Sequence, residues 1–518
     1  RRVHGERGAH KNMEFHKLLA IILFSLLVVS HTVLCYDKKQ IKSICRKLPH
    51  PGPCEVFLGQ SSSKNLPNLK LNALAIILKV TQEQASHGLN YTASLGPKCK
   101  DPRERTAWSD CLQLHELTVE QLKKINSLPC TSVEKQTWLS ASLTNLETCR
   151  QGFRDLGVTT NVFPLIPNNA SFMISNCLAL NMVPENKTKT SFFEGFPDWV
   201  TSGDRKLLQS TSTNPNVVVA QDGSGNYKTV SQAVAAASGQ SRFVIRVKAG
   251  TYNENVEIKA DKVMLVGDGM GKTIITGSQS VGSGSTTFRS ATVAVTGDSF
   301  IAQGITFRNT AGPQNHQAVA FRSGSDLSVY YQCSFEGYQD TLYVYTQRQF
   351  YKSCNIYGTV DFIFGNAVVV IQNSNIYARN PPNNINTITA QGRTDPNQNT
   401  GISIHACTVT GSGLSAGAKT YLGRPWQQYS RAVFMKSNLG SLIDPAGWYP
   451  WSGSFALDTL YYGEYANTGP GSSTANRVSW KGYHAIASAS VASEFTVDNF
   501  IAGGSWIPAT GVPFTSGL

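Results

Sequence analysis

A short repeat in the second half of the chain limits the folds that the sequence can adopt. The segment CSFEGYQD at 333–340 aligns with CNIYGTVD at 354–361, a spacing of 21 residues. The segment SNIY at 374–377 continues the pattern, and CTVTG at 407–411 resembles it again after a longer loop. Such short periods are typical of solenoids, in which each repeat is one structural unit. The pattern therefore predicts a parallel β-solenoid in which each repeat forms one coil.

The sequence around the repeat has the same character from Val217 onward. Short runs rich in β-branched residues alternate with Gly, Asn and Asp, as expected for strands separated by turns. One helix is expected, at Val230–Ala237. The clearest predicted strands are Phe243–Val247, Val263–Val266, Thr292–Val295 and Val368–Ile371. We therefore expect an all-β domain over 215–518.

The segment 36–200 has a different periodicity. Leu74, Ile77 and Leu78 recur at helical spacing, as do Leu114, Leu117 and other apolar residues that follow. Val133–Phe153 is a further amphipathic stretch, and such faces are buried when helices pack together. The sequence therefore predicts an all-α helical bundle in front of the solenoid.

The beginning of the chain has the features of a secretory signal. Met13 is followed by Lys17 and by an apolar run from Leu18 to Val29. That run is shorter than the roughly 20 residues that a membrane-spanning helix needs, so an anchor is the weaker alternative. We expect a signal peptide at 13–35, preceded by an upstream extension at 1–12.

Secretion changes how the cysteines and asparagines are interpreted. Ten cysteines remain after residue 35, and in an oxidising compartment most of them are expected in disulfides rather than at metal ions. No pair has the C-x-x-C spacing of a zinc site. Asn90, Asn169 and Asn186 stand in glycosylation sequons.

A polar segment at 201–214 separates the two halves and contains the basic pair of Arg205-Lys206-Leu207-Leu208. A basic pair between two domains of a secreted protein is a candidate processing site, although it can also be a solvated charge pair. The net charge of +13 favours an acidic partner, either a polyanionic saccharide or a nucleic acid. No basic block with interleaved aromatic residues is present, so we do not expect nucleic acid.

The repeat places two carboxylates together. Asp340 and Asp361 hold equivalent positions on adjacent coils, roughly 4.8 Å apart. Two carboxylates so close do not both ionise readily, so one is expected to be a neutral acid and the other an anion. A capping pair or a calcium-binding pair is the structural alternative. Gln317 and Gln339 also fall near equivalent positions, where their amides suit an oxyanion hole. Arg424 can hold one carboxylate ionised.

The motifs of the second half together resemble those of plant pectin methylesterases made as precursors. They are GTYNE at 250–254, HQAVA at 316–320, QDTL at 339–342, DFIFG at 361–365 and LGRPW at 422–426. The resemblance covers 215–518 and implies a right-handed parallel β-helix that hydrolyses the methyl esters of pectin. The helical half resembles the inhibitor-like pro-region of these enzymes through DC at 110–111, WLSA at 138–141 and TC at 148–149.

The resemblance also implies roles for individual residues. Asp361 would be the nucleophile, and Asp340 would protonate the departing methanol and then take a proton from water. Gln317 and Gln339 would stabilise the oxyanion, and Arg424 would orient Asp361 and contact the substrate. Residues expected to bind the substrate in the sugar cleft are Thr287, Gln317, Tyr343, Phe364, Arg424, Trp426 and Trp448. No metal and no cofactor are expected.

Disulfides are expected on two grounds. The resemblance implies the pairs Cys45–Cys54 and Cys111–Cys149. The register of the repeat independently predicts a bond between Cys333 and Cys354, with Cys407 free because another coil separates it from Cys354. The states of the remaining cysteines, Cys99, Cys130 and Cys177, are left open by both arguments.

Partners and location follow from the same resemblance. The expected partners are methyl-esterified homogalacturonan, a separate inhibitor protein, and a subtilisin-like protease that cleaves after Leu208. The protein is expected to be a secreted monomer of the cell wall. Its pro-region, 36–208, is expected either to inhibit the enzyme until cleavage or to serve folding and sorting.

Three alternatives of other classes remain. A pectate lyase would need a calcium-binding cluster of carboxylates and a basic residue, whereas a polygalacturonase would need acid–base carboxylates for the glycosidic bond. Neither explains the two glutamines beside the aspartates. A non-enzymatic binder with an inactive β domain is disfavoured by the intact set of five polar residues.

Overall fold

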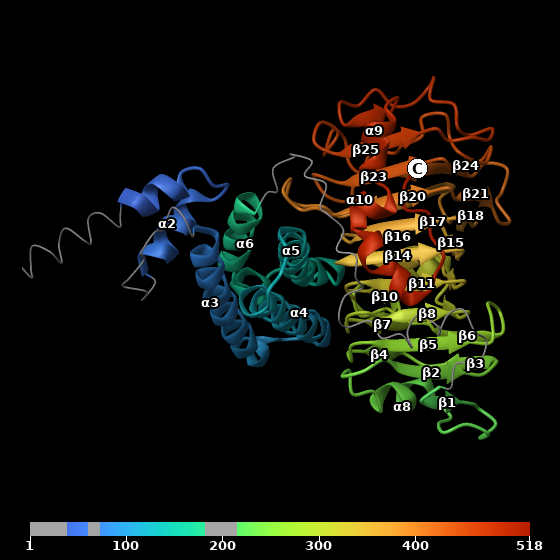
Figure 1. Ribbon diagram of the computed structural model, residues 1–518, viewed down its shortest axis with the longest axis horizontal. Coiled ribbons are helices and arrows are strands. Elements are labelled where there is room, and N and C mark those ends of the chain that lie inside the picture. Colours follow the sequence, from blue (N-terminus) through green and yellow to red (C-terminus); the bar gives the residue numbers. More distant parts are fainter. Residues whose placement is uncertain (1–38, 61–72, 182–214) are drawn as a thin grey trace, which may run out of the picture.

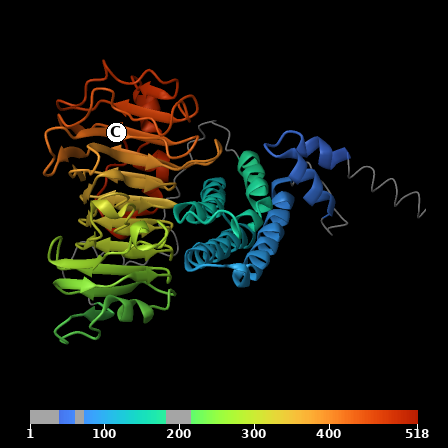
Figure 2. The same ribbon diagram turned by 180° about the vertical axis from the view of Figure 1, so that it is seen from behind.

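The computed structural model describes residues 39–60, 73–181 and 215–518 of the chain. The expected extension, signal peptide and linker with its processing site, together with Asn186, lie outside the described residues. A helical body and a tall column of stacked strands lie next to each other (Figure 1). The view from behind shows the helices against one side of that column (Figure 2).

The helical body confirms the bundle expected from the apolar periodicity. Its two long helices nearest the column both have side-chain caps. Asp101 accepts a hydrogen bond from the Glu104 N–H at 2.9 Å, and Thr131 forms a reciprocal capping box with Glu134. These capped residues mark the N-termini of α4 and α5, the two helices that lie closest to the strands of the column. The helices are α2 (Pro51–Gln60), α3 (Ala73–Ser94), α4 (Pro102–Ser127), α5 (Ser132–Asp155) and α6 (Asn169–Leu180).

Two disulfides fasten the helical body. The bonds are Cys45–Cys54 and Cys111–Cys149, which are the pairs implied by the resemblance. The second joins α4 to α5. His115 lies within 4.8 Å of both sulfurs of that bond, but the bond removes the thiolates that a metal ion would bind. Cys99, Cys130 and Cys177 are free thiols.

The column is a parallel β-helix of three sheets, as the repeat predicts. Every pairing between its strands is parallel. The first sheet contains β1 (Val217–Val219), β2 (Phe243–Val247), β5 (Val263–Gly267), β8 (Ile301–Gln303), β11 (Ser328–Tyr331), β14 (Arg348–Lys352), β17 (Val368–Gln372), β20 (Gly401–His405), β23 (Arg431–Met435), β25 (Tyr461–Tyr465) and β26 (Tyr483–Ala485).

The other two sheets are hydrogen-bonded in the same direction. The second sheet contains β3 (Gly250–Asn253), β6 (Thr273–Gly277), β9 (Thr306–Asn309), β12 (Ser334–Glu336), β15 (Asn355–Gly358), β18 (Asn375–Ala378), β21 (Thr408–Gly411) and β24 (Asn438–Leu439). The third, called the site sheet here, contains β4 (Val256–Ile258), β7 (Val293–Val295), β10 (Phe321–Ser323), β13 (Leu342–Val344), β16 (Val360–Gly365), β19 (Ile385–Gln391) and β22 (Lys419–Gly423).

Strand register confirms the alignment of the repeats. Ser334 pairs with Asn355, which pairs with Asn375, which in turn pairs with Thr408. The residues directly before these four are therefore also stacked. They include Cys333 and Cys354. The chain enters the second sheet through a residue with positive φ. Gln332, with φ of 52°, is one example, and the residues at the same position on the following coils also have positive φ.

The disulfide expected between Cys333 and Cys354 is wrong, because both residues are buried free thiols. Stacked side chains on adjacent parallel strands point the same way and stay one strand spacing apart, roughly 4.8 Å. A disulfide needs Cβ atoms only ~3.5–4.5 Å apart. The two sulfurs instead contact the carbonyl oxygens of Tyr331 at 3.5 Å and Tyr330 at 3.4 Å. Cys407 is free as expected.

Short helices cover the ends and one face of the column. α8 (Val230–Ala235) is the helix expected at this position and packs on the first coils through Val230 and Ala233. α9 (Ala489–Ser493) precedes α10 (Val497–Ile501), which packs on the first sheet. The outer face of the site sheet has a different cover. There Tyr343, Phe364 and Ala390 share an apolar cluster with residues of α4 and α5.

Candidate active site

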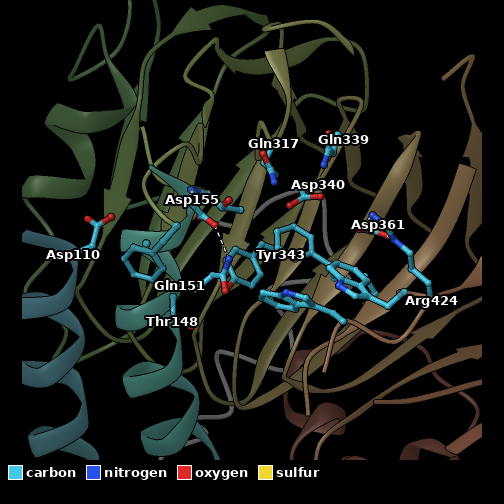
Figure 3. Close-up of a pocket in the computed structure, with 17 residues that line it drawn as sticks. Asp110, Thr148, Gln151, Asp155, Gln317, Gln339, Asp340, Tyr343, Asp361 and Arg424 are labelled. Carbon is cyan, nitrogen blue, oxygen red and sulfur yellow. Dashed lines mark hydrogen bonds and ion pairs between the residues drawn. The ribbon is translucent and has the colours of Figure 1, made fainter. Parts of the chain in front are cut away.

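Asp340 and Asp361 hold the same place on neighbouring coils. Because β13 and β16 pair with Leu342 opposite Ile363, the residues two positions earlier also lie opposite each other. Both aspartates have left-handed backbone, with φ of 61° and 53°, which is uncommon outside glycine. They are only 7 % and 5 % exposed. The two carboxyls therefore meet in one shielded cavity, as Figure 3 shows.

Arg424 holds both oxygens of Asp361. Its Nε donates to Oδ1 at 2.8 Å and its Nη2 donates to Oδ2 at 2.7 Å. The hydroxyl of Thr387 donates to the same Oδ1 at 2.6 Å. Donors of this kind stabilise the ionised carboxylate and fix its orientation. Asp361 is thus the member of the pair with a cationic partner.

Asp340 lacks such a partner, and its environment favours the neutral acid. Burial raises the pKa of Asp340 well above its usual value, and the negative charges of Asp361 and Asp155 raise it further against the opposing effect of Arg424. The two carboxyl groups therefore have different electrostatic surroundings although they are equivalent in the repeat. An anion next to a neutral acid is the arrangement of a nucleophile beside a proton donor.

Gln317 and Gln339 lie beside the two aspartates. They come from adjacent coils, since the N–H of Ala318 donates to the carbonyl of Gln339 at 3.2 Å. Both line the same cavity, and in Figure 3 their side chains lie above the Asp340 carboxyl. Two amide groups at this position can donate hydrogen bonds to an oxygen that becomes negative during a reaction.

Aromatic side chains form the floor of the cavity next to the acids. Tyr343 and Phe364 stack at 4.1 Å between ring centroids, and Trp426 meets Phe364 edge-on at 5.9 Å. Thr287 lies at the edge of the same cavity. These four residues were all expected in the sugar cleft, and apolar ring faces of this kind suit the faces of sugar rings.

The expectation that Trp448 lines the cleft is wrong. Its side chain is 1 % exposed, stacks on Tyr462 at 4.1 Å and donates its indole N–H to Glu464 at 3.2 Å. It is therefore part of the core. The cavity is lined instead by Trp451, which is 36 % exposed and lies 4.3 Å from the Arg424 guanidinium. Both tryptophans stand in the segment WYPW, and the pattern gave no sign of which one faces outward.

Comparisons with known proteins agree with this geometry. The family model "Pectinesterase" matches residues 216–504, and "Plant invertase/pectin methylesterase inhibitor" matches residues 39–180. Pectinesterase 2 of Citrus sinensis is 62 % identical over 96 % of this chain and 98 % of its own length. The chain belongs to the pectinesterase family.

Solved structures of the family resemble the column. Pectin methylesterase from carrot is 56 % identical, with a TM-score of 0.58, over 60 % of this chain and 100 % of the carrot chain. Pectin methylesterase from Aspergillus niger is 30 % identical, with a TM-score of 0.52, over 57 % of this chain and 97 % of its own. We therefore call 215–518 the pectinesterase domain and 39–181 the inhibitor-like domain.

The inhibitor-like domain contributes to the same cavity. Thr148, Gln151, Gly152 and Asp155 of α5 line it, and Asp110 of α4 reaches its edge. In Figure 3 Thr148, Gln151 and Asp155 lie across the pocket from Asp361 and Arg424. The sequence carries no local signal for them, because the docking of two domains depends on surfaces that each fold creates separately.

Polar contacts fix the position of the inhibitor-like domain. From α4, Lys124 forms an ion pair with Asp298 at 2.6 Å. From α5, the indole N–H of Trp138 donates to Asp326 at 3.0 Å. Three further contacts from the pectinesterase domain side are Tyr345 to Asn145 at 2.7 Å, Asn366 to Thr144 at 2.8 Å, and Gln398 to the carbonyl of Ser140 at 3.0 Å. The inhibitor-like domain therefore covers the site sheet with specific partners.

Proposed function

We propose that Asp361 is the nucleophile with which this pectinesterase removes methyl esters from homogalacturonan. The observation that carries the proposal is the pairing of an Arg424-bound Asp361 with an Asp340 of raised pKa in one cavity. An ionised carboxylate can attack the ester carbonyl only if a second group protonates the leaving alcohol, and Asp340 suits that role.

The steps balance without a cofactor. An Asp361 oxygen bonds to the ester carbon, and the amides of Gln317 and Gln339 donate to the resulting oxyanion. Collapse of this intermediate breaks the bond to the methoxy oxygen, which takes the Asp340 proton and leaves as methanol. Asp340 then removes one proton from a water molecule, whose oxygen bonds to the acyl carbon while the bond from that carbon to Asp361 breaks. The galacturonic acid departs and loses its remaining proton to the solvent, and both aspartates return to their first states.

The experiment that tests this function separates methanol from chain shortening. Methyl-esterified pectin is incubated with residues 215–518, and methanol is measured together with the length of the polymer. We expect methanol at unchanged chain length. Shortening without methanol would favour a lyase or a polygalacturonase, which are the competing enzymes of the β-solenoid class.

The inhibitor-like domain acts, in this proposal, as an intramolecular inhibitor. Asp155 accepts a hydrogen bond from the N–H of Thr287 at 3.2 Å, so α5 ends inside the cavity that pectin must enter. A tethered domain needs little intrinsic affinity, because its effective concentration is ~mM through a short linker. Cleavage at Arg205–Leu208 by a subtilisin-like protease would then release the enzyme. A role in folding or sorting alone is the alternative.

We also propose that the protein is a secreted, monomeric glycoprotein of the cell wall. Asn90 and Asn169 are exposed on the inhibitor-like domain, as glycosylation requires. Among the described residues, no helix is both long and apolar enough to cross a membrane. A separate inhibitor protein could bind the released domain on the surface that the inhibitor-like domain covers here.

A further inference from the structure

Strand β16 contains one extra residue at the place where it carries Asp361. Val360 lies opposite Thr387 of β19, and Ile363 lies opposite Thr389, so three steps along β16 correspond to only two along β19. Such a β-bulge interrupts the regular hydrogen bonds between two strands and changes the direction of the side chains within it. The direction of the Asp361 side chain is therefore set by the bulge and by the groups of β19 that contact it.

The hydroxyl of Thr387 contacts Asp361 twice. It accepts a hydrogen bond from the Asp361 N–H at 2.9 Å and donates its own proton to Asp361 Oδ1 at 2.6 Å. A hydroxyl has one proton to donate and lone pairs with which to accept, so both hydrogen bonds can exist together. Thr387 is only 1 % exposed. One buried side chain thus connects the backbone of the bulge to the carboxyl group.

The preceding coil has the same arrangement without the hydroxyl. Val360 stands next to Asp340 as Thr387 stands next to Asp361, because Val360 pairs with Thr387 and the two aspartates also lie opposite each other. The Asp340 N–H donates to the carbonyl oxygen of Val360 at 3.1 Å, and the valine side chain has no polar atom. The two aspartates therefore differ in a hydroxyl group that only Asp361 has beside it.

The two oxygens of the Asp361 carboxyl have different numbers of donors. Oδ1 accepts from the Thr387 hydroxyl at 2.6 Å and from the Arg424 Nε at 2.8 Å. Among the described residues, the one donor to Oδ2 is the Arg424 Nη2, at 2.7 Å. Each oxygen of a carboxylate has about two lone-pair sites for such contacts. Both sites of Oδ1 are thus occupied, whereas Oδ2 retains one that can form a bond to carbon.

We propose that Thr387 is a positioning residue that orients Asp361 so that Oδ2 is the atom that attacks the ester carbon. The proposal rests on the proposed function and adds the attacking atom to it. A lone pair of Oδ2 forms the bond to carbon, and the π electron pair of the ester carbonyl moves to the carbonyl oxygen. Thr387 acts through Asp361 and does not contact the substrate. Its hydroxyl and the Arg424 guanidinium restrain the carboxylate from two sides, which keeps Oδ2 aligned for attack.

Removal of the hydroxyl tests the positioning role. Residues 215–518 are used, because the carrot enzyme corresponds over 100 % of its solved chain to 60 % of this one, the size of the pectinesterase domain. Thr387→Val retains the branched shape and gives Asp361 the same neighbour that Asp340 has. Its kcat for methanol release should fall roughly tenfold or more, while KM should change less than about twofold. Thr387→Ser retains the hydroxyl and should keep kcat within about threefold of wild type.

A matched control removes a similar hydroxyl elsewhere. Thr273 of β6 is buried on the second sheet, outside the cavity of the two aspartates. Its hydroxyl accepts from the Asp268 N–H at 2.9 Å and donates to the carbonyl oxygen of Val247 at 3.1 Å. Thr273→Val should leave both kcat and KM within about twofold of wild type, because no group near the reaction changes. Thermal unfolding verifies that each variant is folded, and Thr387→Ala replaces Thr387→Val if the latter does not fold.

The outcomes distinguish this proposal from the proposed function. A folded Thr387→Val variant with the kcat of wild type would overturn the positioning role. An equal loss in Thr387→Ser would also overturn it, since a loss that the hydroxyl does not restore is an effect of packing. Asp361→Asn is measured in the same assay. If Asp361→Asn is inactive and Thr387→Val is fully active, only the positioning role is wrong, whereas an active Asp361→Asn variant would overturn the proposed function itself.

Discussion

Asp155, the last residue of α5, lies in the cavity that holds Asp340 and Asp361 and accepts a hydrogen bond from the Thr287 N–H at 3.2 Å. A residue of the inhibitor-like domain thus occupies part of the cavity proposed as the active site of the pectinesterase domain. The same residue also affects the acid beside it, because the charge of Asp155 contributes to the raised pKa of Asp340.

Truncation of this contact should partly activate the precursor. Asp155→Ala in the full chain removes the hydrogen bond to Thr287 and should raise methanol release about fivefold, the effect of roughly one hydrogen bond. Glu83→Gln, at an exposed site of α3, is the matched control and should change nothing. If the unmodified precursor already equals residues 215–518 per molecule, inhibition is absent and only a sorting role remains.

Inhibition should weaken as the pH rises. In the closed precursor, burial together with Asp361 and Asp155 raises the pKa of Asp340, so docking favours the protonated acid. In the released domain the solvent reaches Asp340 and Asp155 is absent, which lowers that pKa. The closed state therefore binds a proton that the open state releases. The free-energy difference that favours the closed state declines as the pH rises through the raised pKa of Asp340.

The measurement is the ratio of methanol release by the precursor to that by residues 215–518, taken at each pH. The ratio cancels the pH dependence of the chemistry itself. It should increase with pH, and less steeply in Asp155→Ala. A ratio that stays flat or falls would contradict the assignment of the proton to the closed state.

The activity should require the two hydrogen bonds from the Arg424 guanidinium to Asp361, and not only the positive charge of Arg424. Arg424→Lys retains the positive charge but cannot donate to both oxygens of Asp361, so methanol release should fall by roughly tenfold or more. Arg308→Lys, which alters a comparable ion pair on the second sheet, should have no such effect. Equal thermal stability of the two variants shows that the loss is local. Activity retained in Arg424→Lys would argue against a role for the fork.

The stacked cysteines should react as thiols. Denaturation of the full chain in an alkylating reagent without reductant should label Cys333, Cys354 and Cys407. Cys45, Cys54, Cys111 and Cys149 should remain unlabelled, because they form the two disulfides. Peptide mass spectrometry reads the result. Recovery of a peptide that links Cys333 to Cys354 would show that the coils approach more closely than their strand spacing allows.

The fold and the acidic pair could be predicted from the sequence because, in a solenoid, residues one repeat apart in the sequence lie next to each other on adjacent coils. A spacing of 21 residues is enough to place Asp340 opposite Asp361, and the structure keeps that register. Side-chain direction is harder to predict, since it depends on the local backbone of each coil. The same register therefore suggested a bond between Cys333 and Cys354 that parallel side chains do not form.

The contribution of the helices to the site could not be predicted from the sequence. Asp110 and Asp155 stand in ordinary amphipathic helices, and nothing in their neighbours indicates a second domain. Trp451 was missed for a related reason. The ring of Trp451 is exposed whereas that of Trp448 enters the core, and apolar character alone does not distinguish the two.

The central claim is that Asp361 attacks the ester, and methanol release by Asp361→Asn in residues 215–518 tests it most directly. The matched control is Asp268→Asn, which alters another aspartate bound by an arginine, Arg246, on the first sheet. Folding of both variants is verified by thermal unfolding. The account predicts that Asp361→Asn loses about 10³-fold or more of its activity while Asp268→Asn retains most of it. A folded Asp361→Asn variant that releases methanol at the wild-type rate would contradict the account.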